Sequence, residues 1–169
     1  MADNIHNFET ERLSIRLLEE KDIDLYVSLY TDPKIMRFIA EPLTESKAKS
    51  SFFTAIKLNN EAPFKQVIWA IVDKSSNEAC GIQNLSMHYE DKRSAEAGLI
   101  LARNVQGRFY PEEALTGMIE YGFTKLGLKT IFAYASQKNR ASKRVVVKAG
   151  FTEFDIAEDK LSFKVESAR

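Results

Sequence analysis

The stretch from residue 95 to residue 135 constrains the fold most, because its hydrophobic period changes twice. Residues 95–101 form an apolar run typical of a strand, 111–126 carry apolar side chains at helical spacing, and 131–135 are again a short apolar run. A strand, helix and strand in this order predict a crossover with parallel strands. Ligands of such units favour the carboxyl ends of the strands, to which helix N-termini also point.

The same two periodicities predict the rest of the architecture. We expect strands around 13–17, 67–73 and 79–85, helices over 20–30, from Thr44 to Asn59 and from Asn139 to Ala149, and further strand from Phe151 onward. The predicted order is β, α, α, β, β, β, α, β, α, β. It indicates an α+β fold, an α/β three-layer sandwich with a central, mostly antiparallel mixed sheet flanked by helices, and one βαβ unit for ligand binding.

Composition narrows the class of protein. A chain of 169 residues without linkers or repeats is expected to form a single domain, 1–169. Its 24 basic and 24 acidic side chains cancel, which argues against DNA or a membrane surface as partner. No apolar segment has the length of a signal peptide core or a membrane span, so a cytoplasmic location is expected. Cys80, with only His6 and His88, predicts no metal site; it is expected to be a packing thiol, with a catalytic nucleophile as the alternative.

The loop 104–110 is the candidate binding loop. It leaves a strand and enters a helix, so free backbone N–H groups and the helix dipole converge there, between Arg103 and Arg108. This arrangement suits a phosphate or pyrophosphate. A plain strand-to-helix turn with solvated arginines is the alternative.

Four segments, TERLSIRLL, SAEAGLIL, QGRFYPEEAL and NRASKRVVVKAGF, resemble, in the same order, segments of the GNAT (GCN5-related) N-acetyltransferases. The match is greatest to the subgroup typified by the ribosomal-protein N-terminal acetyltransferases RimJ and RimL. The resemblance implies an acetyl-CoA-dependent transferase that moves an acetyl group to a primary amine by direct attack in a ternary complex. The acceptor would be a small-molecule amine or a protein N-terminus, including a ribosomal one, and the protein a monomer or a homodimer.

The resemblance also implies roles for individual residues. It assigns the cofactor pyrophosphate to Gln106, Gly107, Arg108, Phe109 and Tyr110, and the pantetheine arm to the backbone of Leu99, Ile100 and Leu101. Asn139 and Ser142 would flank the arm. A helix cap is a compatible role for Asn139, and an exposed serine of the first turn is the alternative for Ser142.

For catalysis, Glu96 is the candidate base through a water, since burial in an apolar strand would raise its pKa. A structural glutamate is the alternative. The acid tyrosine of many relatives is replaced by Val146 and its valine neighbours, so Ser142 is the candidate acid, with Tyr110 and Tyr134 as further candidates.

Two departures from the family pattern leave a second function open. Phe109 stands where the family prefers glycine, and Pro111, where it prefers a small residue, offers no N–H to a phosphate. The alternative is therefore a catalytically weak or silent acyl-CoA-binding member that acts as a binding or regulatory module; a nucleotide-binding module is a third hypothesis. Six aromatic residues are expected either to line an acceptor pocket or to form core: Tyr26, Tyr30, Phe38, Phe52, Phe53 and Trp69.

Overall fold

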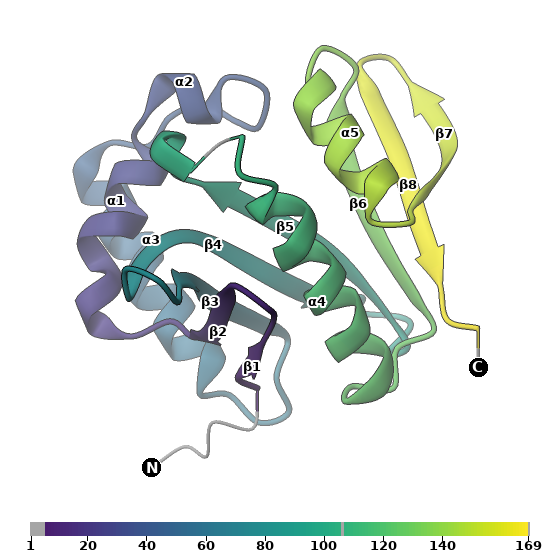
Figure 1. Cartoon of the computed structure of the whole chain (residues 1–169), viewed down its shortest axis with the longest axis horizontal. Coiled ribbons are helices and arrows are strands. Elements are labelled where there is room, and N and C mark those ends of the chain that lie inside the picture. Colours follow the sequence, from purple (N-terminus) through teal and green to yellow (C-terminus); the bar gives the residue numbers. More distant parts are fainter. Residues whose placement is uncertain (1–5, 106, 169) are drawn as a thin grey trace.

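A computed structural model describes residues 6–105 and 107–168 (Figure 1). The elements, in chain order, are β1 (Phe8–Glu9), β2 (Leu13–Leu17), η1 (Glu20–Asp22), α1 (Ile23–Tyr30), α2 (Pro33–Met36), α3 (Glu45–Asn59), β3 (Gln66–Asp73), β4 (Glu78–Met87), β5 (Ser94–Leu101), η2 (Arg103–Val105), α4 (Tyr110–Thr124), β6 (Thr130–Ser136), α5 (Arg140–Lys148), β7 (Thr152–Ala157) and β8 (Lys160–Glu166).

One eight-stranded sheet, ordered β1-β2-β3-β4-β5-β6-β8-β7, forms the middle layer. The larger apolar cluster lies on the face covered by α4 and α5, and includes Trp69, Met118 and Val146. The smaller cluster lies under α1 and α3, around Phe52 and Ile82. Alternating strand side chains supply both clusters, as expected for a sheet covered on both faces. The predicted three-layer α+β architecture is confirmed.

The strands β5 and β6 are parallel, as predicted, but they pair only over three residues. Ser94, Ala95 and Glu96 lie opposite Thr130, Ile131 and Phe132. Beyond these pairs β5 stays paired with β4 to Leu101, and β6 stays paired with β8 to Ser136. The two strands therefore diverge toward their carboxyl ends (Figure 1), and each leaves one backbone edge without a partner strand.

The sequence prediction missed three features. β1 pairs with β2 through only two residues, and α2 is a single turn that begins at Pro33 with Asp32 as N-cap. Elements this short carry too few residues to show a period. The segment after Phe151 is a hairpin of two strands, β7 and β8, rather than one strand.

The ends of the predicted helices were placed to within a few residues. α5 ends as expected, with Gly150 at a φ of +100° directly after the C-cap. α4 ends at Thr124, before the predicted residue 126, and Gly127 has a φ of +69° in the turn that follows. No helix in the described part of the chain is long and apolar enough to cross a membrane.

A buried ion pair fixes the start of α1. Asp22 is only 3% exposed and accepts two hydrogen bonds from the Arg16 guanidinium, at 2.7 and 2.9 Å, and one from the Glu19 backbone N–H at 2.8 Å. This pair joins β2 to the turn that leads into α1.

We predict that Asp22→Asn lowers the free energy of unfolding by about 3 kcal/mol, because it leaves the Arg16 guanidinium with only the exposed Glu19 carboxylate, 3.8 Å away, as counter-charge. Urea unfolding at pH 7 measures the loss. The control is Glu20→Gln, which removes the same charge from an exposed neighbour without an ion pair in the described structure, and should change stability little. Equal effects of the two substitutions would contradict the prediction.

Candidate active site

The loop before α4 has the geometry expected of an anion site. Gly107 has a φ of +86° with open space around it, and Phe109, the N-cap of α4, has a left-handed φ of +60°. The first turn of a helix leaves its N–H groups without partners in the helix, and here Pro111 supplies none. Gln106, the first residue assigned to the pyrophosphate, lies outside the described residues.

A buried carboxylate at the end of β3 holds this loop in place. Asp73, at the end of β3, is 4% exposed and accepts hydrogen bonds from the Tyr110 hydroxyl at 3.0 Å and the Ser75 hydroxyl at 2.7 Å. The Arg108 guanidinium lies 4.0 Å away. The bonds from Ser75, then that from Tyr110 and the charge of Arg108, lower the pKa of Asp73. Tyr110 therefore positions the loop, and its hydroxyl is committed to Asp73 rather than free to act as an acid.

A second carboxylate ties the same loop to the N-terminal strands. Glu113, in the first turn of α4, accepts from the Arg12 side chain at 2.7 Å and from the Arg12 backbone N–H at 2.9 Å. Arg12 also donates to the Arg108 carbonyl at 2.9 Å and lies over the Tyr110 ring. These contacts fix the backbone on both sides of Phe109.

The Phe109 ring points away from the protein interior. It is 61% exposed, and the Lys148 ammonium of α5 lies 4.9 Å from its centroid. Three further basic residues are exposed on α5: Arg140, Lys143 and Arg144. Of the two arginines that flank the loop, Arg103 lies 3.5 Å from Asp32, so neither is simply solvated. Arg108 and Lys148 therefore bring positive charge to the N-terminus of α4, beside the carboxylates of Asp73, Glu112 and Glu113.

Of the three residues predicted to pair with the pantetheine arm, only two direct their backbone N–H and C=O groups toward β6. The Ala102 N–H donates to the Cys80 carbonyl, so alternation along the antiparallel β4–β5 pair turns the polar groups of Ile100 toward β4. The backbone N–H and C=O groups of Leu99 and Leu101 point toward the opening between β5 and β6. The Ile100 side chain packs under α1 and α3, so among the three predicted residues Leu99 and Leu101 have the backbone groups that face the opening between β5 and β6.

Asn139 and Ser142 form the start of α5. The Asn139 side chain is the N-cap and accepts from the Ser142 backbone N–H at 3.1 Å, so the predicted capping role is correct. Ser142 is half-buried, and no hydrogen bond of its hydroxyl occurs among the described residues. Asn139 thus orients the first turn that carries this hydroxyl.

Glu96 is exposed, which contradicts the expected burial. It is the last residue of β5 to pair with β6, and its side chain lies on the face opposite α4 and α5 because Ala95 and Ala97 pack on the helix side. Tyr134 lies on the same face of β6; burial first, and then the nearby Glu96 carboxylate, raises the pKa of its hydroxyl. The structure groups Glu96 with Tyr134 and places Ser142 on the other face of the sheet.

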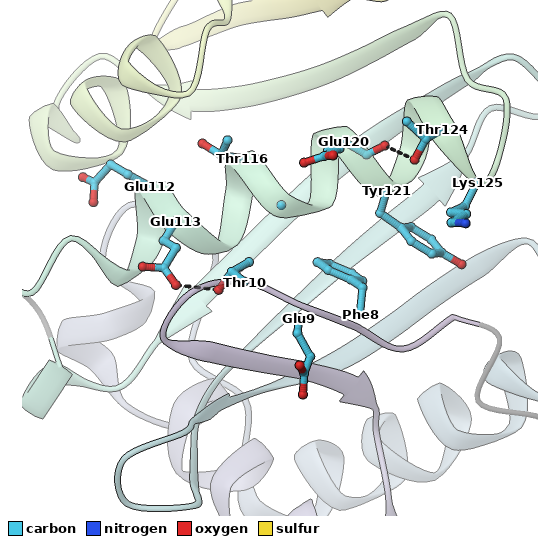
Figure 2. A pocket seen from close by; sticks show the side chains of 11 residues that line it. Phe8, Glu9, Thr10, Glu112, Glu113, Thr116, Glu120, Tyr121, Thr124 and Lys125 are labelled. Atoms are coloured by element: carbon cyan, nitrogen blue, oxygen red, sulfur yellow. Dashed lines mark hydrogen bonds between the residues drawn. The ribbon is translucent and has the colours of Figure 1, made fainter.

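A cavity of about 510 Å³ lies between β1 and α4, and no residue of β5 or β6 is part of its described lining (Figure 2). Four carboxylates line it: Glu9, Glu112, Glu113 and Glu120. Figure 2 shows Glu113 turned toward Thr10, whose hydroxyl donates to it. Because carboxylates repel phosphates, this groove is unsuited to coenzyme A.

The smaller cavity, about 280 Å³, lies among α1, α3, β3 and β4 on the same face of the sheet as Glu96. Of the six aromatic residues considered for an acceptor pocket, Tyr26 and Tyr30 line it. Phe52 is core under α3, Trp69 is buried on the opposite face, and Phe53 is 55% exposed. The face of the helix or strand on which each residue lies separates these roles, which residue type alone does not.

Cys80 is a buried packing residue, as expected. Burial raises the pKa of its thiol to about 11, which leaves little thiolate at neutral pH. Within residues 6–105 and 107–168, no group of three or more His, Cys, Asp or Glu side chains is arranged to hold a metal ion.

Comparisons with known proteins agree with this geometry. The model of the acetyltransferase (GNAT) domain matches residues 12–152. The uncharacterized N-acetyltransferase p20 of Bacillus licheniformis is 28% identical over 152 residues, 89% of this chain and 84% of that protein. The spermidine N(1)-acetyltransferase of Vibrio cholerae is 25% identical over 144 residues, 84% of this chain and 80% of that protein.

Solved structures show the same fold. An acetyltransferase of the GNAT family from Bacillus anthracis superposes with a TM-score of 0.81 at 20% identity, covering 95% of this chain and 98% of that one. The ribosomal-protein-S5-alanine acetyltransferase of Vibrio fischeri gives 0.80 at 18% identity, covering 96% and 97%. Identities this low support the fold alone.

The mixed sheet opens between two parallel strands beside a helix N-terminus, and the matched acetyltransferase domain covers most of the chain. The protein belongs to the GNAT family and is an acetyl-CoA-dependent N-acetyltransferase.

Sequence reasoning missed two groups of polar residues. Asp73 ends an apolar strand, and its partners Arg108 and Tyr110 lie more than thirty positions along the chain. Gln66 and Asn84 line the smaller cavity from neighbouring strands. The one available signal for these residues in the sequence was a polar side chain within an otherwise apolar strand. Which groups each side chain faces is determined by the strand register.

We predict that the stabilising effect of Asp73 depends on pH. Its lowered pKa means that the ionised form stabilises the fold above the ordinary carboxyl pKa of about 3.9, and that this contribution is lost as the pH falls through the folded-state pKa. Asp73→Asn should therefore lower the melting temperature at pH 7, and the difference from the wild type should shrink below about pH 4. Asp155→Asn, at an exposed strand position, is the control. A difference that stays constant to pH 3 would rule out the carboxylate as its cause.

Proposed function

We propose that this enzyme is a RimJ/RimL-like N-acetyltransferase whose acceptor amine attacks acetyl-CoA directly, in the opening between β5 and β6. One observation carries the proposal: pairing between the two strands stops at Glu96, and α4 begins shortly after the unpaired part of β5. Free strand edges and a helix N-terminus thus occur together.

The residues of this opening fit the coenzyme. The backbone of Leu99 and Leu101 would pair with the amides of the pantetheine arm, as a further strand would. The loop from Gly107 to Tyr110 would hold the pyrophosphate, with Arg108 and the basic residues of α5 supplying charge. Gly107 has open space where a side chain would stand, so the ligand can approach the backbone closely.

Acetyl-CoA supplies the acetyl group as a thioester, and the N–C bond to the amine forms as the C–S bond breaks. Glu96 would accept a proton from the acceptor's ammonium group through a water, which leaves the neutral amine to attack the thioester. Its exposed carboxylate lies on the face that holds the smaller cavity. A proton for the departing sulfur would come from Ser142 on the helix face or from Tyr134. A thiol needs little assistance, since its pKa of about 8.5 makes the thiolate a good leaving group.

A weak or silent member that binds acyl-CoA is the second candidate. Pro111 removes one N–H from the first turn of α4, and Phe109 occupies a left-handed position that favours glycine. Both features act on coenzyme affinity, so binding and turnover must be measured separately.

We predict that Glu96→Gln lowers kcat at least tenfold and leaves coenzyme A affinity within twofold, because it removes the base and not the binding groups. Thiol release measures turnover over a panel of amines and peptides, and isothermal titration measures binding. Glu90→Gln, which makes the same change at an exposed residue before β5, should behave as the wild type.

The outcomes separate the candidates. Failure of both coenzyme A and acetyl-CoA to bind would reject the proposed cofactor site. Coenzyme binding without thiol release over the whole panel would favour the silent member. Unchanged turnover of the Glu96 variant would remove this residue from the mechanism.

We predict that Pro111→Ala tightens coenzyme A binding about tenfold, because it restores a helix N–H that can bond a phosphate oxygen, and hydrogen bonds to charged groups contribute about 1.5 kcal/mol or more. Isothermal titration measures the dissociation constant. Pro42→Ala, in the exposed segment before α3, is the control. An unchanged dissociation constant would place the pyrophosphate away from the first turn of α4.

A further inference from the structure

The described residues that line the smaller cavity are all uncharged. Its walls are Tyr26, Tyr30, Ser51, Thr54, Ala55, Leu58, Gln66, Ile68 and Asn84. All its polar groups are hydroxyls or amides, and none of these described lining residues carries a formal charge. By contrast, the cavity beside α4 is lined by four carboxylates.

The hydroxyl side of the cavity is held neutral. The Tyr26 and Ser51 hydroxyls are hydrogen-bonded at 2.7 Å, and the Tyr26 and Tyr30 rings stack with centroids 4.4 Å apart. Burial raises the pKa of both tyrosine hydroxyls above their ordinary value. They therefore stay protonated at physiological pH and present only neutral donors and acceptors.

The side-chain amides of Gln66 and Asn84 connect the cavity to the part of the sheet that contains Glu96. Gln66 and Asn84 both donate to the Ser86 hydroxyl, at 2.6 and 3.1 Å. Ser86 lies directly opposite Glu96, and Asn84 directly opposite Gly98, in the β4–β5 pair.

Because Gly98 has no side chain, the Asn84 amide can lie over β5. A Cβ atom on Gly98 would come within 2.5 Å of the Asn84 Oδ1 atom. The amide wall thus reaches the strand that carries the candidate base, at the point where pairing with β6 has ended.

We propose that this cavity binds the body of the acceptor, and that it selects small primary amines whose other polar groups are hydroxyls or amides over polyamines. This inference rests on the proposed function. A volume of about 280 Å³ has room for one sugar ring or a single residue. A second ammonium group in the cavity would lose water and meet no carboxylate, whereas hydroxyls and amides would find hydrogen-bond partners.

The charge preference is tested by steady-state kinetics with acetyl-CoA and two matched pairs of amines. Glucosamine and serinamide carry neutral polar groups, and putrescine and spermidine carry further ammonium groups. We expect kcat/KM to be at least tenfold higher for one of the first pair than for either of the second. An equal or higher value for a polyamine, or no turnover of either neutral amine while coenzyme A binds, would overturn this inference and leave the cofactor site intact. Loss of coenzyme A binding would overturn both.

A single substitution should shift the selectivity. Asn84→Asp places a carboxylate of the same shape in the amide wall. It removes the amide N–H that donates to Ser86, and the Ser86 hydroxyl can donate to the new carboxylate instead. We expect the ratio of kcat/KM for spermidine to that for glucosamine to rise at least tenfold, with coenzyme A affinity unchanged. Gln66→Glu tests the same wall from β3.

The matched control is Asn77→Asp, the same change in the exposed turn between β3 and β4, outside the cavity. It should leave the ratio unchanged. Melting temperatures of all three variants report whether the fold is retained. Unchanged selectivity in both folded cavity variants would show that the acceptor does not bind here.

Discussion

The short parallel pairing between β5 and β6 is the constraint on which the rest of the site depends. Three residue pairs keep the two halves of the sheet in register, while β4 and β8 hold the outer edges of the two strands along their full length. The inner edges after Glu96 and Phe132 therefore have backbone groups without strand partners. Such groups are costly to bury unpaired, so this opening favours a ligand that carries amides of its own.

The loop that follows β5 is held by charge rather than by intrinsic preference. A left-handed phenylalanine costs free energy, and such a conformation persists only where its surroundings determine it. Here Asp73 holds Tyr110 on one side of Phe109 and Arg108 on the other, and Arg12 bonds the Arg108 carbonyl. The helix N-terminus is therefore positioned before any ligand arrives, which lowers the ordering cost of binding.

Local patterns were sufficient for the fold but not for the site. The two changes of period predicted the βαβ unit, and Asn139 and Gly150 were read as the ends of α5 because capping depends on neighbouring residues. Glu96 was expected to be buried because its neighbours are apolar, yet α1 and α3 contact β4 and β3 and leave this part of the sheet exposed. The orientations of Ile100 and Asn84 follow from the register of the β4–β5 pair, and no local sequence pattern contains this register.

The two faces of the opening differ in charge in a way that separates binding from proton transfer. On the face of α4 and α5, the N-terminus of α4 and the exposed basic side chains of α5 suit phosphates, whereas the carboxylates of α4 line the cavity beside β1. The opposite face combines a neutral cavity with the exposed carboxylate of Glu96. Because no carboxylate in the cavity competes for the acceptor's ammonium group, attraction would draw that group toward Glu96, where the proton must leave. The neutral lining thus orients the amine as well as selecting it.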